Sequence, residues 1–261
     1  MEAVRVINLK VSYAETTVIE RMNLVVPEGK ISIIIGANGC GKSTLLKTMA
    51  RILKPSDGEI YIGGENIKNQ KSRVIAKRMA FLPQTPKCPE QITVRELVAY
   101  GRFPYQKAIG GMDKHDKEQV EWAIAETGLQ ELADRLVESL SGGQRQRVWI
   151  AMTLAQETPI ILLDEPTTYL DMAHQLEVLE LLQRLNQKKQ YTIVMVLHEL
   201  NQACRFADHI IGMKDGAVVC EGNPRDVITK ETLKQIYGID AILQESTEGY
   251  PICTQFERIG S

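Results

Sequence analysis

Nine consecutive residues, 36–44, have the types and spacing of a phosphate-binding loop. They read Gly-Ala-Asn-Gly-Cys-Gly-Lys-Ser-Thr, after an apolar run at 31–35 and before a segment of helical spacing at 45–50. The glycines allow the backbone N–H groups to turn inward around a phosphate, and the helix adds its positive N-terminal end. Lys42 can reach the β- and γ-phosphates, and the Ser43 hydroxyl can coordinate Mg²⁺. The pattern predicts nucleotide binding, because an ordinary glycine turn would leave the lysine and the strand unexplained.

Cys40 lies inside this loop, near Lys42, where thiolate formation is favoured. Two interpretations stay open: a small residue that fills the loop, or a reactive thiol. The remaining cysteines are scattered without a close pair, so neither a zinc site nor a disulfide framework is indicated; they are Cys88, Cys204, Cys220 and Cys253.

Polar residues follow three apolar runs that read as buried strands. Asp164 and Glu165 follow 160–163, Gln84 follows 79–82 with one proline between, and His198 follows 192–197. The carboxyl ends of parallel strands are where such sheets bind ligands. Asp164 is predicted to help hold Mg²⁺, and Glu165 to accept a proton from water attacking the γ-phosphorus. Spacing alone leaves Gln84 unremarkable and makes His198 more typical of a structural histidine than of a catalytic one.

The segment 140–144 reads Leu-Ser-Gly-Gly-Gln and opens another helical pattern. A serine hydroxyl, glycine N–H groups and a helix N-terminus make a second phosphate-binding surface, although a simple capped helix also fits. The chain already has one phosphate loop. Two phosphate-binding surfaces in one chain would be explained by an isologous dimer, in which the phosphate loop of each subunit faces the 140–144 segment of the other.

The elements that position these residues alternate between strands and helices. Short strands at 4–9, 23–26 and 59–62 form a small β unit, and the β–α alternation from 160 onward predicts a mainly parallel, doubly covered sheet. Between 86 and 140 the character is helical, with Thr93 and Glu96 as a capping box and Asp113 opening a second helix. A hairpin turned by Asp215 and Gly216, a helix at 229–237 and short extended pieces from 240 complete the chain.

Composition limits the class of protein. The chain has 261 residues, is 44% hydrophobic and 25% charged, and carries a formal net charge of -2. These values suit one large or two small domains and give no general attraction to nucleic acid. No apolar run approaches the roughly 20 residues that cross a bilayer, and the N-terminus lacks a signal-peptide pattern, so we expect a cytosolic protein.

Taken together, the motifs resemble those of the ATP-binding-cassette (ABC) ATPases over almost the full length, each in family order. The resemblance implies an α/β P-loop fold with a mainly parallel core sheet, a small antiparallel β subdomain and an inserted helical subdomain. It implies a single domain, 1–261, with the core in 1–85 and 156–238, the helical subdomain in 86–155 and a tail at 239–261. It also implies ATP and Mg²⁺ as cofactors.

The resemblance assigns roles to the site residues. Glu165, Gln84 and His198 are implied in catalysis, and Ser43, Gln84 and Asp164 in holding the metal. Residues implied in nucleotide binding are Tyr13, stacked on adenine, Gly36, Ala37, Asn38, Gly39, Cys40, Gly41, Lys42, Ser43, Thr44, Ser141, Gly142, Gly143, Gln144 and Asp171. In many family members the motif that ends at this last aspartate reads Ser-x-Leu-Asp, whereas in this chain it reads Thr-Tyr-Leu-Asp at 168–171.

Within the family, the runs 167–171, 198–203 and 100–104, with His174 and Gln175, resemble the importer subunits for iron-siderophores, haem and cobalamin. The resemblance implies a homodimer closed by ATP, two membrane permease subunits and an extracytoplasmic solute-binding protein, with this chain peripheral on the cytoplasmic face of the membrane. We expect 86–104 to form much of the permease groove. Its exposed contacts are expected at 89–90 and 102–106, while Val94, Leu97 and Val98 pack internally.

Four other functions are weighed against import. A soluble ABC ATPase for iron–sulfur cofactor assembly is the main alternative, and an exporter is disfavoured only by the branch-specific residues. A nucleic-acid ATPase would need long coiled coils or a second cassette, which this sequence does not contain. A cassette that only binds nucleotide is disfavoured by Glu165 and His198. The sequence does not identify the cargo.

Overall fold

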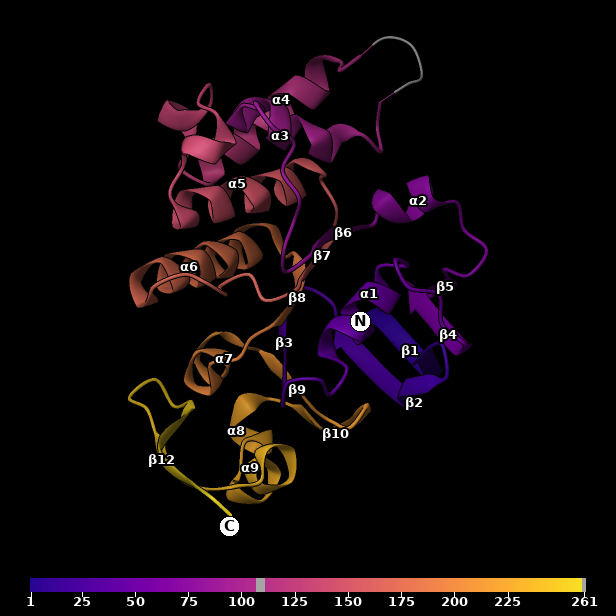
Figure 1. Cartoon of the computed structure of the whole chain (residues 1–261), viewed down its shortest axis with the longest axis vertical. Coiled ribbons are helices and arrows are strands. Elements are labelled where there is room, and N and C mark those ends of the chain that lie inside the picture. The colour runs from indigo at the N-terminus through magenta and orange to yellow at the C-terminus, as the bar shows by residue number, and fades with distance from the viewer. Residues whose placement is uncertain (107–110, 260–261) are drawn as a thin grey trace. The chain divides into compact units, whose positions relative to one another are not determined.

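The structure is a computed structural model that describes residues 1–106 and 111–259 (Figure 1). By its internal contacts the chain forms two units: a first unit of residues 1–69 and 186–261, and a second unit of residues 70–185. Within the described ranges no helix is both long and apolar enough to cross a membrane.

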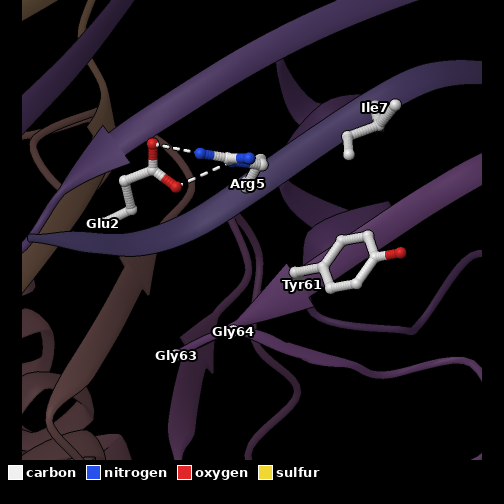
Figure 2. Close-up of a pocket in the computed structure, with 6 residues that line it drawn as sticks. All are labelled: Glu2, Arg5, Ile7, Tyr61, Gly63 and Gly64. Carbon is white, nitrogen blue, oxygen red and sulfur yellow. Dashed lines mark hydrogen bonds and ion pairs between the residues drawn. The ribbon is translucent and has the colours of Figure 1, made fainter.

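An antiparallel sheet opens the first unit. It has the order β2-β1-β4-β5 and comprises β1 (Glu2–Tyr13), β2 (Thr16–Pro27), β4 (Asp57–Ile62) and β5 (Glu65–Asn66). Val4 and Val6 are buried, and the two-residue period of a strand places Arg5 and Ile7 on the opposite face. That face borders a hollow of about 470 Å³, lined also by Glu2, Tyr61, Gly63 and Gly64. Figure 2 shows the residues that line it. Two hydrogen bonds of 2.7 and 2.6 Å join Arg5 to Glu2, so these charges satisfy each other.

The parallel part of the first unit is built on β3 (Ile31–Gly36), every residue of which is buried. β3 pairs in parallel with β8 (Thr192–Val196) and β9 (His209–Lys214), and β9 pairs antiparallel with β10 (Ala217–Gly222). Asp215 and Gly216 turn that hairpin with φ of 46° and 77°, as a tight hairpin turn requires. Helix α1 (Lys42–Met49) follows the loop after β3.

Residues 200–258 form the last elements of the first unit. They include α7 (Leu200–Phe206), α8 (Pro224–Val227), α9 (Lys230–Tyr237) and the antiparallel pair β11 (Ile239–Glu245) and β12 (Pro251–Arg258). The extended pieces expected after 240 are therefore a two-stranded sheet. The Asn201 side chain links α7 to β12 of this sheet: it donates to the Cys253 carbonyl at 3.1 Å and accepts from the Cys253 N–H at 2.8 Å.

In the second unit, β6 (Met79–Leu82) pairs in parallel with β7 (Ile160–Leu163). The helices are α2 (Ser72–Ala76), α3 (Val94–Ala99), α4 (Lys114–Glu126), α5 (Gly142–Ala155) and most of α6 (Met172–Lys189), with 3₁₀ turns η1 (Tyr100–Arg102), η2 (Gln130–Leu132) and η3 (Val137–Ser139). The predicted capping box at Thr93 is confirmed, and Asp113 and Ser141 also begin their helices with capping boxes.

Arg102 corrects one expectation. It was expected among exposed contacts, but it is 0% exposed, and it donates to Asp116 at 2.8 Å, to the Ala155 carbonyl at 2.8 Å and to Glu157 at 3.0 Å. A buried charge is tolerated only when it is paired in this way. Val94, Leu97 and Val98 are buried, as predicted.

The residues beside Arg102 do reach the surface. Tyr100 and Phe103 are 39% and 57% exposed, and their rings stack with centroids 4.8 Å apart. Between them, Gly101 lies so close to α5 that an added Cβ would overlap the Met152 carbonyl and come within 3.0 Å of the Gln156 nitrogen. Residues 100–103 therefore place an exposed aromatic pair beside two buried residues, Gly101 and Arg102.

Candidate active site

In the first unit, β3 ends in the predicted phosphate loop. Gly36 has φ of 153°, and a Cβ there would overlap the Met213 carbonyl and lie 2.8 Å from the Cys40 Sγ. Gly41, immediately before α1, has φ of 103°. Both positions need glycine, because L side chains rarely adopt such backbone conformations. The loop therefore has the curled backbone that a phosphate cradle requires.

Lys42 is the first residue of α1 and is only 5% exposed. Its ammonium donates to the Gly36 carbonyl at 2.8 Å and to the Ala37 carbonyl at 2.9 Å, so the side chain folds back across the loop. The hydroxyl of Thr44, in the first turn of the same helix, lies 3.4 Å from the Tyr13 hydroxyl. The structure thus brings the predicted adenine-stacking residue to the loop, with the tyrosine 45% exposed.

The Cys40 side chain packs inside the loop and is 5% exposed. Burial raises the pKa of its thiol, and the nearby Lys42 ammonium opposes this only in part. A raised pKa and low exposure both disfavour a reactive thiolate. Of the two interpretations drawn from the sequence, the structure favours the residue that fills the loop.

Tyr237, at the end of α9, was not found by sequence reasoning. Its hydroxyl lies against the backbone N–H of Gly36, and burial raises the pKa of this tyrosine. A contact between residues so far apart in the chain leaves no local sequence signal.

In the second unit, Asp164 and Glu165 follow β7. Asp164 is 1% exposed, and its backbone N–H donates to the Leu82 carbonyl. The Glu165 carboxylate accepts hydrogen bonds from the Gln84 side-chain amide and, at 2.9 Å, from the Thr168 hydroxyl. Gln84 and Glu165 are therefore brought together as the strand pattern predicted. Thr168 was not singled out as a site residue, although it lies three residues from Glu165.

The backbone at Glu165 is strained. Its φ is 53°, and Tyr169 in the same loop has φ of 67°. Non-glycine residues in this region cost of order 1–3 kcal/mol each and persist where surrounding contacts impose them, often at functional sites. The two hydrogen bonds to the Glu165 carboxylate are such contacts.

The segment 140–144 forms the beginning of α5. The Ser141 hydroxyl accepts from the Gln144 N–H at 3.3 Å, and the Gln144 side chain accepts from the Ser141 N–H at 3.1 Å. Ser141 and Gly142 are exposed, whereas Gly143 is buried. The capped-helix interpretation is therefore correct. The exposed N-terminal end of α5 is still able to bind a further ligand.

Asp171 begins α6. Its Oδ1 accepts from the His174 backbone N–H at 2.9 Å and lies 2.8 Å from the His174 Nδ1. These hydrogen bonds lower the pKa of the Asp171 carboxyl, so it carries its negative charge at neutral pH. Asp171 remains 66% exposed in its side chain.

His198 follows β8 in the first unit, and its side chain is exposed. Glu199 is the N-cap residue of α7, so His198 stands at the junction between the strand and that helix. The predicted residues thus fall into two groups: Tyr13, the phosphate loop and His198 in the first unit, and Gln84, Asp164, Glu165, Asp171 and the 141–144 segment in the second.

A family model described as "ABC transporter" matches residues 19–168, which is more than half of the chain. The chain belongs to this family. Iron(3+)-hydroxamate import ATP-binding protein FhuC from Bacillus subtilis (strain 168) is 50% identical over 252 residues, covering 96% of this chain and 94% of that protein.

Solved structures of ABC proteins are similar to this chain as well. A transporter described as being of metal-chelate type, in an inward-facing conformation, has a TM-score of 0.83 at 30% identity and covers 98% of both chains. The ATP-binding cassette MJ0796, in a dimeric post-hydrolysis state bound to ADP and Pi, has a TM-score of 0.75 at 31% identity, covering 84% of this chain and 98% of that one. The predicted fold class and the predicted ATPase activity are confirmed.

Proposed function

We propose that this chain hydrolyses ATP to power uptake of a ferric siderophore through membrane permease subunits. The observation that carries the proposal is the identity of 50% across 96% of the chain with an iron(3+)-hydroxamate import ATP-binding protein. An iron–sulfur assembly ATPase has no comparable support.

The phosphate loop receives the triphosphate. Lys42 exchanges its two neutral carbonyl acceptors for β- and γ-phosphate oxygens, and such charge-assisted hydrogen bonds are roughly twice as strong as neutral ones. The positive N-terminus of α1 adds to the attraction. Tyr13 offers an exposed ring for the adenine beside the same loop.

Glu165 orients the attacking water and accepts its proton. The Gln84 amide and the Thr168 hydroxyl fix the carboxylate before the substrate arrives, so little reorganisation is needed during the reaction. The oxygen ligands that Mg²⁺ prefers are present in the hydroxyl of Ser43, the amide of Gln84 and the buried carboxylate of Asp164. Bound Mg²⁺ would neutralise charge that develops on the phosphates.

Two copies complete the site in this proposal. Ser141 and Gly142 present exposed hydrogen-bonding groups at the start of α5, suited to the γ-phosphate held by the partner copy. Beside Asp171, Tyr169 and Met172 are 86% and 83% exposed, and large apolar side chains exposed to this degree suit an interface. His198 lies in the same unit as the phosphate loop of its own chain, and we assign it to the γ-phosphate that this loop holds.

The stacked pair of Tyr100 and Phe103 is the proposed contact with the permease. Aromatic side chains are enriched at interface centres, and the buried Arg102 keeps this pair in place. Docking there would hold the chain at the cytoplasmic face of the membrane. Two permease subunits and an extracytoplasmic solute-binding protein would complete the transporter, and only those parts would contact the cargo.

The catalytic assignment is tested with Glu165→Gln. We expect the variant to bind ATP normally, to form an ATP-dependent dimer that persists in size-exclusion chromatography, and to lose at least a hundredfold in turnover. Glu157→Gln, which changes an acidic residue of the same unit outside the site, is the control. Turnover within a few-fold of wild type in Glu165→Gln would refute the role of Glu165.

The cargo is tested in cells lacking this chain. Uptake of ⁵⁵Fe-labelled hydroxamate and catecholate siderophores, haem and labelled cobalamin is measured with and without the wild-type chain. Loss of ferric siderophore uptake alone supports the proposal. Normal uptake of all four together with lowered activity of iron–sulfur enzymes would instead support the assembly function.

A further inference from the structure

His174 contacts two motifs of the second unit at once. Its Nδ1 lies 2.8 Å from the Asp171 Oδ1, at the start of α6. Its ring also packs on Gly143, at the start of α5, so closely that a Cβ on Gly143 would overlap the His174 Cδ2 and lie 2.9 Å from its Cγ. One imidazole therefore joins the beginnings of two helices that are far apart in the sequence.

Helix capping explains only part of this arrangement. The His174 backbone N–H donates to Asp171 at 2.9 Å, and any residue other than proline at position 174 could make that hydrogen bond. The ring adds a second contact to the same carboxylate oxygen, and its 39% exposure shows that it is partly covered. Capping needs neither the ring nor its packing on Gly143.

Gly143 is explained by the same contact. It is buried and lies within α5 with no positive φ, so the helix itself does not require glycine there. The space that a side chain would occupy is filled by the His174 ring. The neighbouring Gly142 faces Leu170, whose Cδ2 lies 3.9 Å from the position of an added Cβ. Residues on both sides of Asp171 therefore pack on the same end of α5.

We propose that His174 is a positioning residue that holds Asp171 in register with the serine–glycine segment at the start of α5. The inference rests on the proposed function, in which Asp171 and Ser141 act at the interface between two copies. His174 makes the two move together, so that both reach the partner copy in the geometry that hydrolysis requires. It does not itself contact the nucleotide.

The contact is tested by a double-mutant cycle on unfolding, without reference to activity. The variants are Gly143→Ala, His174→Ala and the combination, and urea midpoints are compared at an unchanged slope. In the wild-type background we expect Gly143→Ala to lower the midpoint, because its methyl group meets the ring. In the His174→Ala background we expect less than a third of that shift. Equal shifts in both backgrounds would overturn the contact.

The positioning role is tested by a split between binding and turnover. We expect His174→Ala to leave the Kd of ATP for the isolated subunit within twofold of wild type and to lower the turnover number at least tenfold. His174→Asn restores a donor near the position of Nδ1 without the ring, and His174→Phe keeps a ring without the donor. Each should recover turnover only in part. Full recovery by His174→Phe would refute the role of the Asp171 contact.

His115→Ala is the matched control, because His115 is an exposed histidine of the same unit that faces Glu157. Its turnover should equal that of wild type. If His174→Ala does likewise, the positioning role is refuted. If wild-type protein hydrolyses no ATP, the proposed function fails instead, and the unfolding cycle still decides whether the contact exists.

Discussion

Removing the carboxylate of Asp116 should destabilise the second unit by about 3–5 kcal/mol, the usual result of breaking a buried ion pair and leaving one charge uncompensated. The side chains of Arg102 and Asp116 are 1% and 5% exposed, and their atoms lie 2.8 Å apart. Asp116 also accepts from the Asp113 N–H in the capping box of α4. Asp116→Ala therefore removes a charge partner and a helix cap together.

Glu157 provides the internal comparison. It contacts the same guanidinium at 3.0 Å, but its side chain is 39% exposed, so solvent screens the interaction. Glu157→Ala should cost at most about 1 kcal/mol, as exposed pairs do. Replacing both buried partners, as in Arg102→Met with Asp116→Leu, should recover most of the loss, because no charge then remains buried.

The assay is urea unfolding followed by tryptophan fluorescence. Both tryptophans of the chain, Trp122 in α4 and Trp149 in α5, lie in the second unit, so the signal reports on that unit. Equal losses for Asp116→Ala and Glu157→Ala would refute the argument from burial. If the Arg102→Met, Asp116→Leu double variant loses as much free energy of unfolding as its two single variants lose together, the explanation by buried charge is refuted.

Three further predictions follow from the site and its surroundings. Lys42→Ala should weaken ATP binding at least tenfold in a fluorescent-nucleotide titration while leaving the urea midpoint near that of wild type; unchanged affinity would exclude Lys42 from the phosphate site. Phe103→Ala should leave the ATPase activity of the isolated subunit unchanged and weaken its co-purification with the permease, and intact co-purification would move the docking surface elsewhere. Burial raises the pKa of Cys204 to about 12 from its ordinary 9.0, so its proton favours the folded state. The stability that this proton contributes is complete below pH 9 and is lost as the pH rises toward 12. In a thiol titration at pH 8, the exposed Cys88 should react well before Cys204. Simultaneous reaction of the two thiols would contradict the burial of Cys204.

Local chemistry explains what could be predicted from the sequence. The strands at 79–82 and 160–163 have the expected bounds, because short apolar runs followed by polar residues mark buried parallel strands. Helix starts at Thr93, Asp113 and Ser141 are confirmed because a capping box needs only residues three apart. The phosphate loop is predictable for the same reason.

What the sequence did not reveal depends on distant segments. A charged residue is normally predicted to be exposed, and Arg102 is buried only because α4 and the end of α5 bring acceptors to it. Helix α7, of seven residues, is too short for a clear helical period and was not predicted. The spacing of Asp171 and His174 could have indicated a helix cap, but nothing in the sequence places Gly143 against the ring.

Helix α5 connects the proposed permease contact to the proposed dimer contact. Its 14 residues span about 21 Å. Near its C-terminal end Gly101 packs on Met152 and Arg102 binds the Ala155 carbonyl, while at its N-terminal end Gly143 packs on His174. A rigid helix moves both ends together, so a displacement imposed on the aromatic pair would reach Asp171 through one helix and one imidazole. If that is the route by which transport and hydrolysis are coupled, His174→Ala should retain permease binding but lose stimulation of its ATPase by the permease, whereas Phe103→Ala should lose both.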